Sequence, residues 1–392
     1  MNRASGTEQS LVTAILPEST TEHVLSLLAQ RQGSSGLVWQ ARGTLLREHW
    51  LARWMPPIEP GKTVLQMVVP AAAADGVMAF VADGARLTQQ ATGAVFALPS
   101  TYCHVGSGFH QWSDEELATF TGERAGFGDS LHLICCIVGA SRSERVARAA
   151  VEAGAHGPIV YLSEGRGLRD RIGWLRITKD HQQEVQMVVV DEAQLDDVFN
   201  TMAQAGRFHL PGRGLLYAMP LGRGTVNLPS RFSRHRDEAD LHQIVRAIDH
   251  LAGHSEWRDA PGPSGSRPSE PRASFDTPDR VALTAVVRSE HVDRVTDLIL
   301  DGGAGGLNRV DGRFVGADDL NPEMGARVQH EYVVLRSIVA CEVADYIGKV
   351  VAGSAEDLGV RDLCLLMHPV ARFARYQHGA VDYRAGARAA SA

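Results

Sequence analysis

The sequence predicts an α+β fold built from three tandem copies of one βαββαβ unit. Each copy opens on an apolar, strand-like run, and the three runs begin at Leu11, Leu131 and Val281. The helix-like segment that follows each run ends on two glycines spaced Gly-x-x-Gly. These pairs are Gly33/Gly36, Gly154/Gly157 and Gly303/Gly306. Because a repeat of this length is a whole domain used three times, we expect the copies to form an intramolecular pseudo-trimer.

The domain boundaries follow from length and composition. A chain of 392 residues favours two to four cores, and residues 259–271 are rich enough in Pro, Gly and Ser to predict a mobile linker. The expected units are repeat 1 (1–110), a helical connection (111–128), repeat 2 (129–228), a helix with a flexible linker (229–279) and repeat 3 with a C-terminal tail (280–392).

The middle copy displays the element order most fully. Its third strand is rich in valine, and Leu195, Val198, Phe199 and Met202 form one stripe of a helix. The predicted elements are a strand over 131–138, a helix over 141–153, strands over 158–164 and 184–190, a helix over 192–205 and a strand over 214–219. Their order is βαββαβ, which is a ferredoxin-like unit.

The outer copies carry counterparts of these elements. Residues 62–69 and 328–335 match the third strand of the middle copy, and a helix containing Val339, Val343 and Ile347 follows the second of these segments. All three copies close on a strand that ends in proline. These closing residues are Pro99, Pro220 and Pro369.

Two further helices are expected between the copies. The run Ser113-Asp-Glu-Glu116 is a capping box, and residues 237–251 place their apolar side chains on one face. Trp112 and Trp257 stand beside these helices. We expect both helices to pack on the outside of the repeats rather than to bind a partner.

Composition excludes several classes of protein. A formal net charge of −7, from 39 basic and 46 acidic residues, is too weak a field to indicate nucleic-acid binding. The cysteines have no paired spacing, which predicts reduced core residues; they are Cys103, Cys135, Cys136, Cys341 and Cys364. No apolar stretch approaches the ~20 residues that a membrane helix needs. We therefore expect a cytoplasmic protein that does not itself span a membrane.

Two Gly-Arg-Gly turns in the middle copy are the candidate binding loops. They are Gly165-Arg166-Gly167 and Gly212-Arg213-Gly214. Glycines let backbone N–H groups approach an anion closely, and arginines can fork onto phosphate oxygens. The alternative interpretation is that these glycines are strand-end turns flanked by solvated arginines.

At these loops the chain resembles the PII signal-transduction superfamily, whose members are homotrimers of βαββαβ subunits. Nearly all of the middle copy matches in order, with a T-loop that starts at Gly165 and a B-loop over 211–214. The resemblance implies a small anionic effector, an adenine nucleotide (ATP, ADP or AMP), in a cleft between repeats. It also implies a regulated partner such as a membrane transporter or pump, and recruitment to the inner face of the membrane. The implied nucleotide contacts are Gly157, Gly165, Arg166, Gly167, Arg169, Gly212, Arg213 and Gly214.

The chain also departs from that family. The family's B-loop lysine falls on Leu215, and its T-loop arginine-glutamine pair falls on Leu168 and Arg169. The loop up to Gln183 is short and has no tyrosine for modification. These departures favour a divergent PII-like protein over a nitrogen sensor. The outer copies keep only fragments of both loops, so we expect one or two working clefts rather than three.

Two other functions compete with this hypothesis. CutA-type divalent-metal proteins are similar trimers, but the histidines of the loop that holds Cys103, His104 and His110 lack the spacing of a closed zinc site. A structural scaffold without a ligand is the second alternative. Carboxylates such as Glu164 and Asp191 sit in no recognisable acid–base or nucleophile arrangement, so we expect no enzyme, no catalytic residue and no resident metal.

Overall fold

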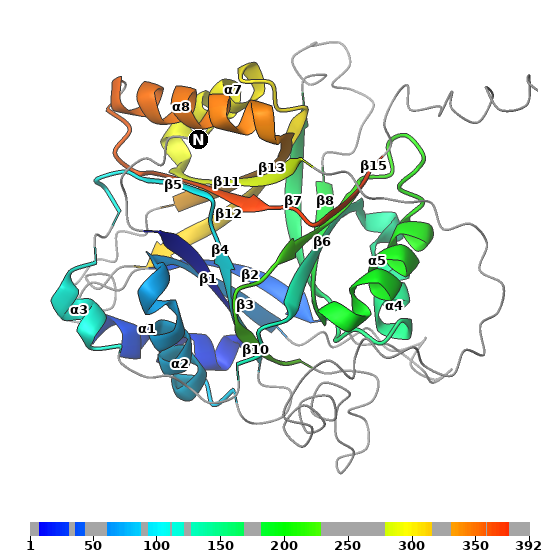
Figure 1. Cartoon of the computed structure of the whole chain (residues 1–392), viewed down its shortest axis with the longest axis horizontal. Coiled ribbons are helices and arrows are strands. Elements are labelled where there is room, and N and C mark those ends of the chain that lie inside the picture. The colour runs from blue at the N-terminus through cyan, green and yellow to red at the C-terminus, as the bar shows by residue number, and fades with distance from the viewer. Residues whose placement is uncertain are drawn as a thin grey trace, which may run out of the picture.

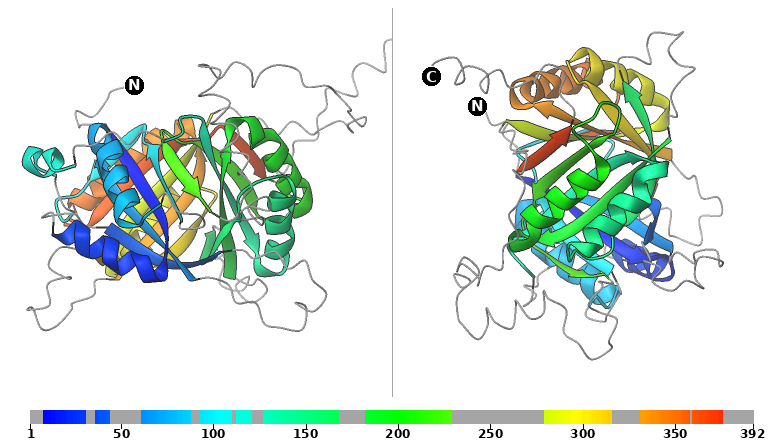
Figure 2. Two further views of the ribbon diagram at one scale, coloured as in Figure 1. Left: turned by 90° about the horizontal axis from the view of Figure 1, so that it is seen from below. Right: turned by 90° about the vertical axis from the view of Figure 1, so that its right-hand side faces the viewer.

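The computed structural model describes residues 8–30, 36–43, 61–87, 93–109, 112–120, 127–167, 182–228, 279–315, 331–357 and 359–375. This part of the chain has a mixed α+β fold around one large antiparallel sheet of fifteen strands. Helices lie in pairs around the outside of the strands, as Figures 1 and 2 show. No helix in the described part is long and apolar enough to cross a membrane.

The first segment of the sheet has its strands in the order β4-β1-β3-β2. Its elements are β1 (Gln9–Pro17), α1 (Glu18–Ala29), β2 (Gly36–Gly43), β3 (Gly61–Pro70), α2 (Ala74–Gly84) and β4 (Gly93–Pro99). A short 3-10 helix over Ala71–Ala73 leads into α2. The strand predicted over 62–69 is β3, while Gly33 lies outside the described residues.

The second segment has the equivalent order β9-β6-β8-β7. Its elements are β6 (Leu131–Gly139), α4 (Ala140–Glu152), β7 (Ile159–Gly167), β8 (Gln182–Asp191), α5 (Glu192–Gly206) and β9 (Leu215–Pro220). Each predicted element of the middle copy is present, and its ends differ from the prediction by three residues or fewer. The helix α5 ends where Arg207 adopts the left-handed conformation, with φ at 52°.

The third segment repeats the order as β14-β11-β13-β12. Its elements are β11 (Arg280–Arg288), α7 (Val292–Asp301), β12 (Gly306–Val315), β13 (Glu331–Ala340), α8 (Cys341–Asp357) and β14 (Leu363–Pro369). A 3-10 turn over Ser289–His291 precedes α7. The prediction that Val339 belongs to a helix is wrong. Val339 pairs with Val281 in β13, because the β-branched run continues to that point, whereas Val343 and Ile347 do lie in α8.

The three segments are joined at the strands β2, β7 and β12. The C-terminal end of each of these strands pairs with the N-terminal end of the next, so the pairings close a ring. The register repeats at every joint: Gly43 faces Ile159, Gly165 faces Asn308, and Phe314 faces Leu37.

Three short strands make a second set of joints. Each follows a closing proline and pairs with the edge strand of another segment; they are β5 (Tyr102–Val105) on β14, β10 (Gly224–Asn227) on β4 and β15 (Arg372–Arg375) on β9. The fourth residue after each closing proline faces the third residue before another one. These pairs are Cys103 with Leu366, Gly224 with Phe96, and Phe373 with Tyr217.

The two faces of the strands belong to different cores. One face of each segment packs against its own helices and forms a separate apolar cluster. The other faces meet in one shared core, to which Phe96, Tyr217 and Leu366 contribute from the three segments. Cys135 lies in the shared core and Cys136 in a helix-facing one, as the alternation of a strand predicts.

The predicted helix between the first two copies is α3 (Asp114–Ala118), which Ser113 and Glu116 close with a capping box. Nε1 of Trp112 donates to the carbonyl oxygen of Val68 at 2.9 Å, and Phe120 packs edge-on against Phe80. This segment therefore packs on the outside of the first segment. The helix predicted over 237–251, Trp257 and the linker over 259–271 lie outside the described residues.

Candidate functional site

The structure brings the two Gly-Arg-Gly strings to the same end of the second segment. The prediction that the first string is a turn is wrong, because Gly165, Arg166 and Gly167 are the last residues of β7 and pair with β12. Gly167 ends β7, Gly214 precedes β9, and the ladder places both at the C-terminal end of β6, with β8 between β6 and β7. Three strand spacings separate β7 from β9, which is roughly 14 Å. Gly157 precedes the start of β7 and lies at the opposite end of the strand, roughly 26 Å from Gly165. Arg169 lies outside the described residues.

The first string, at the end of β7, is paired with the third segment. Gly165 faces Asn308 in the sheet, and Nη1 of Arg166 lies 2.7 Å from Oδ1 of Asp293 on α7. Nε of Arg166 also lies 3.8 Å from Glu164. A ligand that binds the Arg166 guanidinium would therefore have to share it with Asp293.

The second turn is shaped by its glycines. Gly212 and Gly214 have φ values of 70° and 110°, which side chains rarely adopt. A Cβ on Gly214 would lie 2.0 Å from the carbonyl oxygen of Ile137, whereas a Cβ on Gly212 would meet nothing within 4 Å. Gly214 thus permits the close approach of the loop to β6, and Gly212 leaves open space beside the loop.

Three arginines gather at this second turn. Arg142, in the first turn of α4, donates from Nη2 to the carbonyl oxygen of Gly212 at 3.3 Å. Burial lowers the pKa of Arg142, and the positive charges of Arg213 and Arg145 lower it further. Nε of Arg142 is buried and has no hydrogen-bond partner among the described residues. The N-cap residue Gly139 supplies no side-chain cap, so the first amides of α4 point to the same end.

This arginine cluster (Arg142, Arg145 and Arg213) is suited to an anion. Guanidinium groups at close range repel one another. A bound phosphate or carboxylate would offset that repulsion, and its oxygens would accept hydrogen bonds from the guanidinium N–H groups. Sequence reasoning identified Arg213 but missed Arg142 and Arg145. Their spacing of three residues, directly after a strand, was the available signal, because it places them on one face at the start of a helix.

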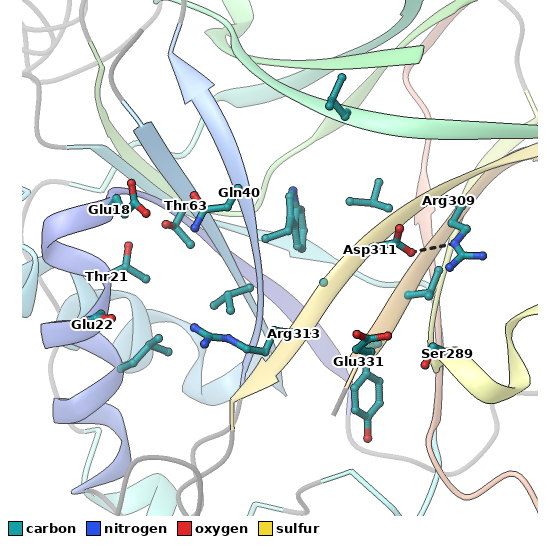
Figure 3. A pocket seen from close by; sticks show the side chains of 18 of the residues that line it. Glu18, Thr21, Glu22, Gln40, Thr63, Ser289, Arg309, Asp311, Arg313 and Glu331 are labelled. Carbon is teal, nitrogen blue, oxygen red and sulfur yellow. Dashed lines mark hydrogen bonds and ion pairs between the residues drawn. The ribbon is translucent and has the colours of Figure 1, made fainter. Parts of the chain in front are cut away.

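A separate pocket of about 980 Å³ lies between the first and third segments (Figure 3). It is lined by the start of α1, the middle of β2, and parts of β12 and β13, and Leu162 of β7 also reaches it. Its charged side chains are Glu18, Glu22, Asp311, Glu331, Arg309 and Arg313. Nε of Arg309 pairs with Oδ1 of Asp311 at 2.9 Å.

Two apolar residues of this pocket are unusual. Trp39 is 5% exposed, and its Nε1 has no hydrogen-bond partner among the described residues. Leu162 is 67% exposed. Both line the pocket, but the Trp39 ring packs edge-on against Tyr161 in the shared core, so only Leu162 gives the pocket an uncovered apolar side chain.

Metal-binding groups do not gather in the described residues, where no set of three His, Cys, Asp or Glu side chains could hold an ion. His104 is half-buried on β5, and His110 lies outside the described residues. All five cysteines are free thiols. Burial raises the pKa of the Cys135 thiol to about 11, so this thiol is protonated at neutral pH.

Comparisons with known proteins do not assign the chain to a family. No model of a known protein family matches the sequence, and no curated protein matches it either. Among solved structures, a microcompartment protein from Desulfitobacterium hafniense aligns at 10% identity with a TM-score of 0.17, over 61% of this chain and 95% of that one. An aspartate kinase from Synechocystis aligns at 8% identity with a TM-score of 0.21, over 92% of this chain and 43% of that one.

Proposed function

We propose that this chain is a PII-like regulatory protein whose three ferredoxin-like repeats close into an intramolecular pseudo-trimer. The repeated strand order and the repeated register at both sets of joints support this geometry. A closed ring made from one chain lets each cleft diverge separately, which three identical subunits cannot do. The divergence of the two outer copies fits that freedom.

The proposed effector is a small anion, in the first place an adenine nucleotide, bound by its phosphates at the arginine cluster. The observation that carries the proposal is the gathering of Arg142, Arg145 and Arg213 beside the second turn, at the uncapped start of α4. Hydrogen bonds between guanidinium and phosphate are charge-assisted and often bidentate, so they account for both the residue type and its repetition.

The second turn contributes more to the proposed site than the first. Arg213 has no ion pair or side-chain hydrogen bond among the described residues, whereas Arg166 is already held by Asp293. Gly212 leaves space for a ligand beside the backbone, since no atom lies within 4 Å of a Cβ built there. We therefore assign the phosphates to the Arg213 side of the sheet end.

Regulation would follow from a population shift. The effector must bind one conformation of the chain more tightly than another, and a partner protein must distinguish the two. A membrane transporter or pump is the proposed partner, and this rests on the resemblance to the PII superfamily alone.

The test is calorimetry of the full chain against ATP, ADP, AMP, cyclic AMP and bicarbonate. We expect one of these anions to bind. Arg142→Gln and Arg213→Gln should each weaken its affinity at least about tenfold, because each removes about one charge-assisted hydrogen bond. Arg148→Gln is the matched control, because Arg148 lies on the same helix and, among the described residues, pairs only with Glu144. Binding that all three variants retain would overturn the proposed site.

A further inference from the structure

We propose that the shared core holds a binding site for a small monovalent anion of the chloride class, at the guanidinium of Arg336 in β13. This site is separate from the arginine cluster and goes beyond the proposed nucleotide site. Arg336 is a cation that contacts buried side chains of the first and second segments, and no described carboxylate pairs with it. A charge inside a core needs a compensating charge, so the cation itself indicates the kind of ligand.

The contacts of Arg336 are all with neutral groups. Its Nη1 donates to the hydroxyl of Tyr161, and its Nη2 donates to Oε1 of Gln66 at 3.3 Å. Its Cζ also lies 5.5 Å from the ring centroid of Trp39 and 5.9 Å from that of Tyr161. A guanidinium carries more N–H donors than these two hydrogen bonds use, and the described residues supply no acceptor for the others. Donors therefore remain for a ligand.

Buried carboxylates do not compensate this charge. Glu184 is the one buried Asp or Glu among the described residues, and its Oε1 pairs with Nη2 of Arg42 at 2.7 Å. Val185 belongs to the shared core, so Glu184, the residue before it in β8, faces the opposite side of the sheet. The negative charge nearest in kind is thus both used and turned away from Arg336.

The equivalent place in the other two segments holds an uncharged residue. In each segment the fifth residue of the first strand faces this place in the ladder. The equivalent pairs are Thr13 with Gln66, Cys135 with Met187, and Thr284 with Arg336. Because glutamine and methionine fill the place in two of three copies, the fold does not require a cation there. The charge of Arg336 therefore favours a role in binding over a role in packing.

Arg336 can be reached from one end of the shared core. Its side chain is half-buried, whereas Val334, two residues earlier on the same face of β13, is buried. Ile338, two residues later on that face, is half-buried as well, and so is Val68, which holds the matching place in β3. The shared core is therefore less covered toward the C-terminal ends of β3 and β13, and a small ion can enter there without opening the ring.

The surroundings favour a small anion with a single charge. One guanidinium balances one negative charge, and the groups that contact it are neutral. Burial raises the pKa of Tyr161 to about 12, so its hydroxyl stays protonated and can donate to an anion while it accepts from Arg336. A phosphate would bring further negative charge into an apolar surrounding, where uncompensated charge is costly. The site thus differs from the arginine cluster in charge as well as in place.

The first test is a crystal structure of the full chain grown in sodium bromide, with diffraction recorded at the bromine absorption edge. We expect an anomalous peak within hydrogen-bond reach of the Arg336 guanidinium and the Tyr161 hydroxyl. Arg336→Met should remove the peak and still fold, because Met187 fills the equivalent place. The control Arg148→Gln changes an exposed arginine and should keep the peak. A water alone beside Arg336, or a carboxylate of the chain paired with it, would overturn the inference.

Thermal denaturation tests the same site in solution. Sodium chloride replaces sodium gluconate at constant ionic strength, and the midpoint of unfolding is recorded. For one anion bound by the folded chain, each tenfold rise in chloride above its dissociation constant should raise the midpoint by roughly 2 °C. Arg336→Met should reduce this response, and Arg148→Gln should keep it. No response, or an equal response in the natural chain and in Arg336→Met, would count against the site.

A matched pair of variants at Gln66 isolates the charge. Gln66→Glu places a carboxylate where the amide oxygen accepts from Nη2 of Arg336, so the chain itself supplies the negative charge and should displace the ion. Gln66→Met removes the same amide without adding a charge and should keep the bromide peak. A peak that survives Gln66→Glu would show that Arg336 does not hold the ion. These variants leave the arginine cluster intact, so nucleotide binding should survive them, and the two proposals can fail separately.

Discussion

Nδ1 of His368, in β14, lies 3.0 Å from the carbonyl oxygen of Pro99, the residue that closes β4. The imidazole is 2% exposed, and its Nε2 has no hydrogen-bond partner among the described residues. His368 is therefore a buried neutral group that joins the third segment to the first, and a proton on Nε2 would have no acceptor there.

Acid should destabilise the fold through His368. Burial lowers the pKa of His368 from 6.5 to about 4, so the unfolded chain binds a proton that the folded chain does not between these values. Stability is therefore complete above pH 6.5 and is lost as pH falls toward 4, by up to roughly 3 kcal/mol. Urea unfolding at pH 7.0, 5.5 and 4.5 measures this loss, and His368→Gln should flatten it. The exposed His209→Gln is the control; an equal slope in both variants would refute the assignment.

A polar contact at the centre should contribute measurably to stability. Nη1 of Arg336, in β13, donates to the hydroxyl of Tyr161, in β7, and Nη2 donates to Oε1 of Gln66, in β3, at 3.3 Å. Tyr161→Phe removes an acceptor from a guanidinium inside the shared core, at a cost of about 1–3 kcal/mol in the free energy of unfolding. Tyr346→Phe, on a ring that is 58% exposed, should cost almost nothing. Equal midpoints of denaturation would contradict the contact.

Two helical glycines should respond in opposite directions to alanine. A Cβ on Gly76 of α2 would lie 1.7 Å from the carbonyl oxygen of Phe120, so Gly76→Ala must displace the segment that contains α3. A Cβ on Gly353 of α8 would meet nothing within 4 Å, and Gly353→Ala should stabilise the helix by about 0.5–1 kcal/mol. Thermal denaturation of the two variants measures both effects. A stabilising Gly76→Ala would show that α3 does not pack where described.

The ion pair of Arg166 should matter little for the anion. Its side chain is 32% exposed and that of Asp293 is 77% exposed, so the pair contributes at most about 1 kcal/mol. We expect Arg166→Gln to leave anion affinity within about twofold in calorimetry, whereas Arg213→Gln weakens it. A loss at Arg166 as large as at Arg213 would move the site to the first string.

The order of elements could be predicted from the sequence because each strand and helix carries its own local pattern. The strand pairings that join the three segments could not be predicted in this way. The strands β5, β10 and β15 are four residues long and show no periodicity of their own, so only their partners define them. The sequence pattern extends the helix to Val339 because the β-branched run and the helix after it share apolar residues without a break.

The candidate sites likewise combine residues that a local pattern identifies with residues that only the fold brings together. Arg213 stands in a recognisable Gly-Arg-Gly string, but Arg142 joins it only because β6 and β9 are neighbours. Glu22 and Arg313 belong to distant parts of the chain, and the ring of β2, β7 and β12 brings them to one pocket. Contacts of this kind depend on tertiary structure, which single-sequence patterns do not encode.

A crystal structure of the full chain with ATP tests the central claim most directly. The account predicts phosphate oxygens between Arg142, Arg145 and Arg213, at hydrogen-bond distance from their guanidinium groups. ATP bound in the pocket beside Glu22, or a crystal grown at saturating ATP with the arginine cluster unoccupied, would contradict it.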